Sequence, residues 1–309
     1  MSHHALSSES LEDARHSSAR PSALRSNKAQ RHRLFLATWY AVNSLLVISI
    51  LLAAYSVGWE YSTRRYLKGF SDAIVPVAGS PEEKITSILN WMSSGPARNP
   101  NGPAAIMPNR DPTDTLNYDS LMRVCGSATN AFINLTDSAG LSARRLLLLD
   151  SNHQAKHVVA EVLIEGRWII VDPAFRVLLR GTNGKMLTRE QLADPETFTA
   201  ATRDIPRYDP SYTFERTAHI RMSRIRSVGL PLRHALNVLL PGWEDSTTVS
   251  LLVERQSLAV MVVAIVLLLF LSLVRISLRW YGERFLKFRA VRIRDQIRRA
   301  CIAFLDTAR

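Results

Sequence analysis

Two long apolar segments constrain the fold of this chain more than any other feature. Residues 34–59 and residues 256–274 contain no Asp, Glu, Lys or Arg. A helix needs about 20 apolar residues to cross the hydrocarbon core of a bilayer. Both segments are long enough, so we expect transmembrane helices at 34–58 and 256–274. A cleaved signal peptide is the alternative for the first, but its length and the preceding residues 1–33 favour an uncleaved anchor.

The net charge of +12 is concentrated in the segments that flank the apolar ones. Residues 1–33 carry +3 and residues 275–309 carry +7, whereas residues 60–255 carry only +2. Basic residues close to membrane spans stay on the cytoplasmic side. We therefore expect a two-pass protein of the inner (cell) membrane, with both termini cytoplasmic and a domain at 59–255 outside the cytoplasm. No nucleic-acid motif accompanies the charge, so nucleic acid is not an expected partner.

The two basic tails differ in pattern. Residues 1–33 are rich in Ser, His and Arg without apolar periodicity, which predicts disorder. Residues 275–309 interleave ten basic residues with aromatic and branched apolar ones. This pattern predicts an amphipathic helix on the anionic inner leaflet of the membrane. A solvated or partner-bound helix is the alternative.

The middle segment contains signals for two helices. Ser80 can cap a helix in which Pro81 takes the first position, and an apolar stripe follows at helical spacing. A second helix is expected from Cys125 to about Ser138, and Gly140 ends it. The stripe predicted to face the core consists of Ile85, Ile88, Leu89 and Met92.

Strands are expected after the second helix. Alternating and β-branched residues predict strands at 144–149, 156–164 and 167–171, with Glu165 and Gly166 as the turn between the last two. Residues 188–203 look helical again. The long segment 94–114 is rich in Gly, Pro and Asn, and it is predicted to be a loop. This loop forms either the wall of a substrate cleft or a surface segment without a function.

Cys125 is a candidate nucleophile. The only other cysteine is Cys301, which the predicted topology places on the opposite side of the membrane, so the two cannot pair. A single thiol in an oxidising compartment suggests a function, although an inert core cysteine is the alternative. The predicted helix start would favour its thiolate.

His157 and Asp172 are the candidate partners of this thiol. A two-residue turn at Glu165 and Gly166 places Asp172 opposite Val159, and His157 then projects from the same face two residues away. Such diagonal neighbours lie about 7–8 Å apart, within reach of long side chains. His153 is an alternative base, and Glu161 shares the face as an expected salt-bridge group.

These residues carry a family resemblance. Cys125-Gly126, the run from Gly140 to Arg144, the run from His157 to Val162 and the run from Gly166 to Pro173 resemble a transglutaminase-like domain, over about 80–175. The family is related in mechanism to papain-like cysteine enzymes. The resemblance implies an α+β fold in which a Cys-bearing helix packs on an antiparallel sheet that bears the His and the Asp.

The resemblance also implies roles. Cys125 would be the nucleophile, His157 the general base and acid, and Asp172 the orienter of His157, with no metal or cofactor. Arg123 and Val159 depart from the family's usual Gly and aromatic residue, which affects the shape of the substrate channel rather than the triad.

Three hypotheses about function follow from these observations. The first is a membrane-anchored cysteine hydrolase or acyltransferase that acts on amide or ester groups of a protein or peptide through a thioester. The alternative is a catalytically silent binding or scaffold domain in cell-envelope or exopolysaccharide assembly. A membrane adaptor acting through its basic tail is a third hypothesis. The oligomeric state is not indicated.

Overall fold

The computed structural model describes residues 20–94, 111–117, 121, 124–220, 234, 236–238 and 240–285. These residues form two compact units. One comprises residues 55–262, and the other contains the described parts of residues 1–54 and 263–309. Residues 95–110 of the loop predicted at 94–114 lie outside the described residues, as do residues 1–19 and 286–309 of the tails. The described end of that predicted loop is helical rather than irregular over Pro112–Thr115.

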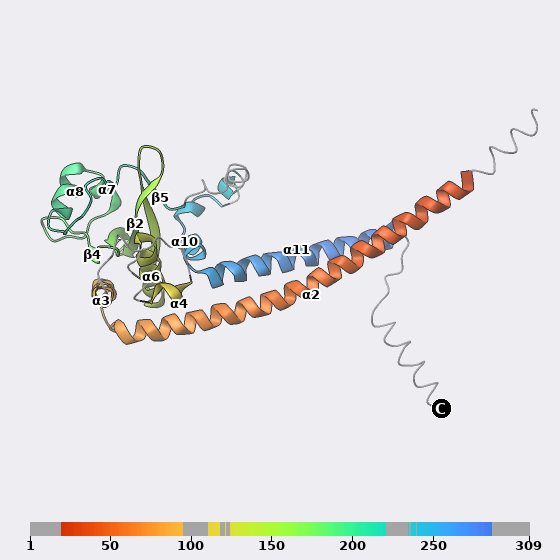
Figure 1. Cartoon of the computed structure of the whole chain (residues 1–309), viewed down its shortest axis with the longest axis horizontal. Coiled ribbons are helices and arrows are strands. Elements are labelled where there is room, and N and C mark those ends of the chain that lie inside the picture. Colours follow the sequence, from red (N-terminus) through yellow and green to blue (C-terminus); the bar gives the residue numbers. More distant parts are fainter. Residues whose placement is uncertain are drawn as a thin grey trace, which may run out of the picture. The chain divides into compact units, whose positions relative to one another are not determined.

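Two long helices contain the apolar segments. Helix α2 spans Arg20–Ile74 and helix α11 spans Gln256–Arg284, each drawn as one continuous ribbon in Figure 1. Both are long and apolar enough to cross a membrane, a test that core helices and signal sequences also pass. Only 17% and 22% of their most apolar windows are buried, which distinguishes them from core helices of a soluble domain.

Helix α2 begins earlier and ends later than the apolar segment predicts. It starts at Arg20, inside the tail 1–33 that the sequence predicts to be disordered. Residues 20–33 contain Ala, Leu, Arg, Lys and Gln, and such helix formers extend an existing helix without a new nucleation step. At the other end α2 continues beyond residue 58 to Ile74, where Leu67 is buried in the core of the larger unit.

The larger unit is an α+β domain built on an antiparallel sheet. The strand order is β4-β3-β2-β1-β5. The strands are β1 (Ala143–Leu149), β2 (Ala155–Ile164), β3 (Arg167–Asp172), β4 (Val177–Leu178) and β5 (Thr217–Ala218). The three predicted strands are confirmed, each extended by one residue at one end. The two short edge strands were not predicted, because two residues carry no periodicity.

The β2–β3 hairpin has the predicted register. Glu165 and Gly166 both have positive φ angles, 48° and 78°, as a type I′ turn requires. Ala160 pairs with Val171 and Glu161 with Ile170, so the pairing is symmetrical about this turn.

The two predicted helices begin and end as their capping signals indicate. Helix α3 (Pro81–Ser93) has Ser80 as its N-cap, with a reciprocal capping box to Glu83. Helix α6 spans Cys125–Ser138, and Gly140 follows it with a φ of +81°. The N–H groups of Gly140 and Leu141 donate to carbonyls of the last turn, a pattern that needs this left-handed residue.

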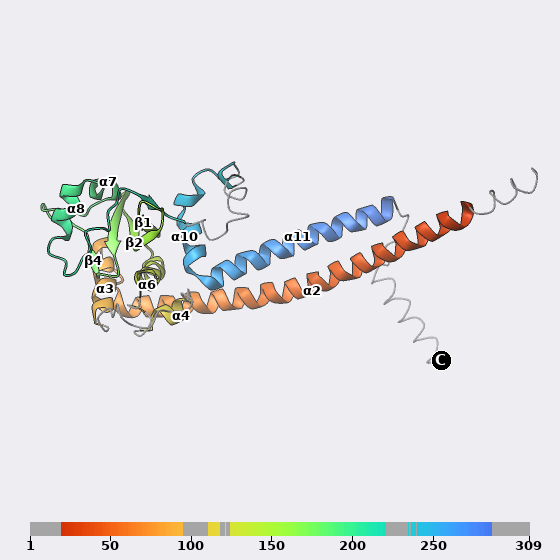
Figure 2. The same cartoon turned by 45° about the horizontal axis from the view of Figure 1, so that its top comes forward.

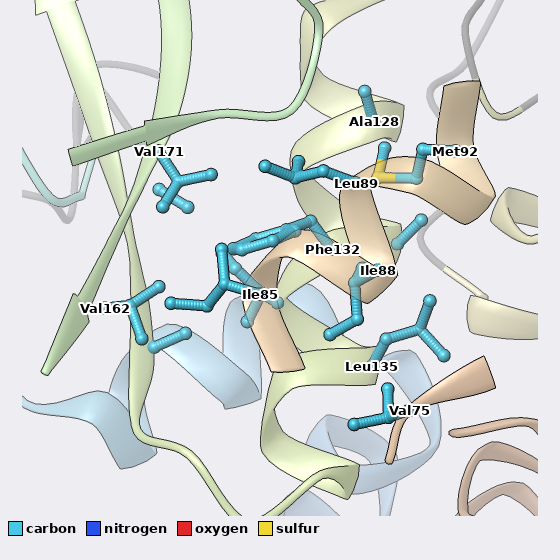
Figure 3. Close-up of a cluster of buried hydrophobic side chains, with 14 of the residues drawn as sticks. Val75, Ile85, Ile88, Leu89, Met92, Ala128, Phe132, Leu135, Val162 and Val171 are labelled. Carbon is cyan, nitrogen blue, oxygen red and sulfur yellow. The ribbon is translucent and has the colours of Figure 1, made fainter. Parts of the chain in front are cut away.

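The sheet separates two apolar clusters. One face packs against α3 and α6 and against Leu67 and Val75, whereas the other packs against residues 192–214. Figures 1 and 2 show α6 on one side of the sheet and α7 and α8 on the other. In the first cluster the fully buried Phe132 lies at the centre, between α3 and the strand residues Val162 and Val171 (Figure 3).

Residues 188–203, which the sequence predicts to be helical, contain two short helices. Helix α7 covers Arg189–Leu192 and helix α8 covers Pro195–Thr202. Asp194 caps α8, and its side chain accepts the N–H of Thr197. Pro195 cannot donate a backbone hydrogen bond to α7, so it ends one helix and begins the next.

The described part of the larger unit also contains two short α-helices and a 3-10 helix. Helix α4 spans Pro112–Thr115, the 3-10 helix η2 spans Trp243–Asp245, and helix α10 spans Thr247–Glu254. Arg255, between α10 and α11, has an extended backbone that separates the two helices.

Candidate active site

Cys125 is the first residue of α6 and is half-buried. The residue before it, Val124, has no side-chain acceptor with which to cap the helix. The N-terminus of α6 therefore lies at Cys125, where the positive end of the helix dipole favours an anion. Ser127 stabilises this helix start instead, because its hydroxyl oxygen accepts the N–H of Val124 at 3.3 Å.

Helix α6 is tied directly to the strand that carries the histidine. The Thr129 hydroxyl donates to the carbonyl of Val158 at 3.1 Å. Strand β2 also contains a bulge at this end, since Leu148 pairs with His157 but Leu149 pairs with Ala155, which leaves Lys156 unpaired. Bulges redirect the side chains next to them. The bulge adjoins His157, the residue whose orientation the site depends on.

His157 and Asp172 form a buried hydrogen bond. Their Nε2 and Oδ2 atoms are 2.7 Å apart, and neither side chain is exposed. The second carboxylate oxygen of Asp172 accepts the backbone N–H groups of Ala174 and Phe175 at 3.0 and 3.2 Å. The carboxylate is therefore held at both oxygens. The side-by-side placement expected from the hairpin register is confirmed.

The electrostatics of His157 favour the imidazolium. Burial lowers the pKa of this side chain, but the hydrogen bonds and negative charges of Asp172 and Cys125 outweigh it and raise the pKa to about 9. The Nδ1 atom is buried and has no nitrogen or oxygen partner among the described residues. Because Nε2 is occupied by Asp172, Nδ1 is the ring atom that remains for the thiol.

Three aromatic rings enclose the imidazole. Tyr212 stacks on it with the ring centroids 4.2 Å apart and the planes within 4° of parallel. The rings of Phe175 and Tyr208 approach at an angle, with centroids 5.8 and 6.3 Å from it. Together they exclude water from the bond between His157 and Asp172, and an ionic hydrogen bond is stronger without water.

The Tyr208 hydroxyl is buried beside the Asp172 carboxylate but does not meet the geometry of a regular hydrogen bond. Burial and then the charge of Asp172 raise the pKa of this phenol, which keeps it neutral. A neutral hydroxyl next to Asp172 adds no charge that competes with the imidazolium.

The other two residues considered from the sequence lie in different surroundings. Glu161 is buried and forms salt bridges with Arg144 at 2.6 Å and with His219 at 2.8 Å, which confirms the expected salt-bridge role. His153 is exposed in the turn between β1 and β2, where its φ is 58°.

Several residues around the site were not predicted. Tyr208 and Tyr212 lie in a segment rich in Tyr, Pro and charge, whose composition signals no particular contact. Gly126, Asn130 and Asn134 form a stripe at intervals of four along α6, and this spacing was a readable signal for a second, polar face of the helix.

The comparisons with known proteins identify one domain. Residues 68–173 match the sequence model of the Transglutaminase-like superfamily. This range begins near the end of α2 and contains Cys125, His157 and Asp172. Neither a curated protein nor a solved structure matches the chain.

Proposed function

Because residues 68–173 form a domain of the transglutaminase-like superfamily, we propose that the chain is a cysteine enzyme acting on amide or ester acyl groups. Cys125 is the nucleophile, His157 the general base and acid, and Asp172 the residue that orients His157. The observation that carries the proposal is the buried 2.7 Å bond between His157 and Asp172, next to a cysteine at a helix start. A nucleophile, a base and an orienting group are the parts that covalent acyl transfer needs.

Each group takes one part in the proposed reaction. His157 holds the thiol proton of Cys125, and the thiolate attacks the carbonyl carbon of the substrate. The C–N or C–O bond then breaks, and His157 gives its proton to the leaving amine or alcohol, which leaves a thioester on Cys125. Water or an amine next gives a proton to His157 and attacks the thioester, so the product leaves and the thiol is restored.

The start of α6 supplies charge stabilisation for the attack. The N–H of Cys125 belongs to the first turn of the helix, at the positive end of the helix dipole. Such a donor, aimed at the oxygen that becomes negative in the tetrahedral intermediate, lowers the barrier of acyl transfer.

The substrate that fits this chemistry is a protein or peptide. Attack on a side-chain or main-chain amide needs the thiolate and the proton donor that Cys125 and His157 provide. Hydrolysis follows when water is the acceptor, and cross-linking or transfer follows when an amine is the acceptor.

We propose that the chain is anchored in a membrane by α2 and α11. The two helices expose large apolar side chains along their length, including Ile48, Leu51, Leu269 and Phe270. Bilayer hydrocarbon is the environment in which such surfaces are stable. Because basic residues next to membrane spans stay on the cytoplasmic side, the proposed topology has both termini in the cytoplasm and the enzyme domain outside it. Reporter fusions test this topology: fusions at the C-terminus should be active inside, and fusions near residue 200 outside.

The competing proposal is a catalytically silent domain that binds a peptide or glycan. The complete burial of the His157 side chain favours it, because a silent domain can keep the histidine covered. Both proposals agree on the fold, so only chemistry at Cys125 separates them.

Acyl trapping distinguishes the two. The full chain in detergent is mixed with p-nitrophenyl acetate, and the peptide containing Cys125 is analysed by mass spectrometry for an acetyl thioester. We expect a rapid burst of nitrophenol and acetylation of Cys125, both lost in Cys125→Ala and retained in the matched Cys301→Ala variant. A wild-type chain whose Cys125 is acylated no faster than a cysteine in an unstructured peptide would refute the enzyme proposal.

The fate of the thioester identifies the acceptor. Release of acetate in buffer indicates hydrolysis, whereas formation of an acetyl amide when glycine ethyl ester is added indicates transfer to amines.

A further inference from the structure

A second polar cluster extends from the start of α6 to the α10–α11 junction, and it plays no part in the proposed chemistry. Its centre is the ion pair between Arg145 in β1 and Glu254 at the end of α10. The Arg145 side chain is 11% exposed and the Glu254 side chain is fully buried. Buried ion pairs contribute little net stability compared with apolar residues of the same size. A role in holding neighbouring groups in place therefore accounts for this pair better than stability does.

Arg145 contacts the residue next to the nucleophile. Its Nη2 atom donates to the carbonyl of Gly126 at 3.2 Å and to the Glu254 carboxylate at 2.8 Å. Nε lies 2.6 Å from the other carboxylate oxygen, although the angle there does not meet hydrogen-bond geometry. One nitrogen thus bridges the first turn of α6 and the end of α10.

Glu254 is itself held by α6. The Asn130 amide donates to the Glu254 carboxylate at 3.0 Å, and the Asn134 amide donates to the Glu254 carbonyl at 3.3 Å. Gly126, Asn130 and Asn134 lie one turn apart on the same stripe of α6. The end of α10 is therefore docked along the helix that begins with Cys125.

The next residue continues this docking. Arg255 donates to the Asn134 side chain at 2.9 Å and to the Asp137 carboxylate at 2.7 Å. It also lies 3.4 Å from Glu60 of α2, and the hydroxyl of Ser257 donates to the same carboxylate at 2.7 Å. The position of α6 in the domain is thus fixed by the junction that leads into α11.

We propose that Arg145 is a positioning residue for Cys125, held in place by Glu254 at the α10–α11 junction. This inference rests on the proposed function, because it concerns the placement of the nucleophile relative to His157. Arg145 bonds a carbonyl in the first turn of α6, so it limits sliding and rotation of that turn. Small displacements of a reacting atom are costly: a shift of about 1 Å can lower a rate by about 100-fold.

The test separates positioning from stability with a double variant. Removing one partner leaves a buried charge, so Arg145→Gln or Glu254→Gln is expected to destabilise the chain. The double variant Arg145→Gln/Glu254→Gln has no unpaired charge and is expected to melt close to the wild type. The control is Arg144→Gln/Glu161→Gln, which removes a buried ion pair between β1 and β2 and the bond from Glu161 to His219, and Arg144 projects from the opposite face of β1 to Arg145.

The readout is the pH profile of Cys125 alkylation by iodoacetamide in the full chain, quantified on the peptide that contains Cys125. In the double variant at Arg145 and Glu254 we expect a rate at pH 7 at least about tenfold below that of the wild type. The midpoint should shift towards that of a free thiol, because the thiol has moved from His157. The control pair should keep the wild-type profile.

A profile of the double variant that superposes on the wild type would overturn the inference. If the double variant does not fold, Arg145→Lys provides the test. Lys keeps the positive charge beside Glu254 but lacks the forked guanidinium that also reaches the carbonyl of Gly126. An intermediate profile supports positioning, and a wild-type profile contradicts it. The proposed function fails separately, when wild-type Cys125 reacts no faster than a free thiol.

Discussion

Replacement of Asp172 by Asn tests the electrostatics of the site with a change of one atom. The Asn oxygen can still accept the N–H groups that Asp172 binds, from Ala174 and Phe175. The new amide nitrogen faces Nε2 of His157, where Oδ2 lies at 2.7 Å in the native chain. That nitrogen is a donor, so Nε2 must become an acceptor. The ring proton then occupies Nδ1, on the side of Cys125, and the imidazolium is disfavoured.

The size of the effect follows from the pKa of His157. This pKa is raised from 6.5 to about 9 against the opposing effect of burial, and Asp172 is the largest of the raising causes. A rise of this size corresponds to roughly 3 kcal/mol, or a few hundred-fold in the protonation equilibrium. Because Asn carries no charge and burial remains, we expect the pair of imidazolium and thiolate to weaken by up to a few hundred-fold.

The pH dependence of Cys125 alkylation by iodoacetamide measures this change. In the native chain the imidazolium is present below about pH 9 and lost above it, so the thiolate should persist well below neutral pH. In Asp172→Asn the rate should follow a free thiol, which has a pKa near 8.5 and is only about 1% ionised at pH 6.5. The two profiles should converge above pH 9.

A second carboxylate provides the matched control. Asp194 caps α8 from an exposed position, and Asn is an equally good cap, so Asp194→Asn should leave the profile unchanged. Native reactivity at pH 6.5 in Asp172→Asn would refute the assignment of Asp172 as the source of the raised pKa.

Three further substitutions test the fold and the enclosure of the site. Phe132→Ala should lower the free energy of unfolding by about 3–5 kcal/mol, because this ring is fully buried at the centre of the α3–α6 cluster. Urea denaturation measures the loss, and a loss no larger than that of Leu163→Ala, at a partly exposed position, would contradict the prediction. Gly166→Ala should cost about 1–2 kcal/mol, since the residue has a φ of 78°; an unchanged thermal midpoint would show that the turn relaxes without strain. Tyr212→Leu should slow Cys125 alkylation at pH 6.5 several-fold, because it removes the ring stacked on His157. Tyr212→Phe should keep an alkylation rate close to that of the native chain, and equal rates in the two variants would exclude a role for the ring.

The parts of this fold that sequence predicted are those governed by local rules. Glu165 and Gly166 form a two-residue turn, and that length fixes the register of β2 against β3. Alternation along a strand then determines which side chains share a face. The turn position and this alternation together predicted that His157 and Asp172 lie close together. The ends of α3 and α6 were likewise determined by residues within one turn of them, Ser80 and Gly140.

The parts that sequence did not predict depend on contacts between distant segments. Tyr212 stacks on a histidine 55 positions earlier, a distance along the chain over which composition and spacing give no information. The helical character predicted at 188–203 is present, but the Asp194-Pro195 signal divides this segment into two helices. A stop signal inside a periodic segment is stronger evidence than the period.

Helix α6 illustrates the difference most clearly. Its apolar face, which contains Ala128 and Phe132, packs in the core. Its polar face, Asn130 and Asn134, is just as buried, but the partners Glu254 and Arg255 come from more than a hundred positions away. An apolar face is expected to find some apolar surface, whereas buried amides need particular donors and acceptors. The polar face of a buried helix is therefore where geometry is specified, and in this chain that face begins at the residue after Cys125.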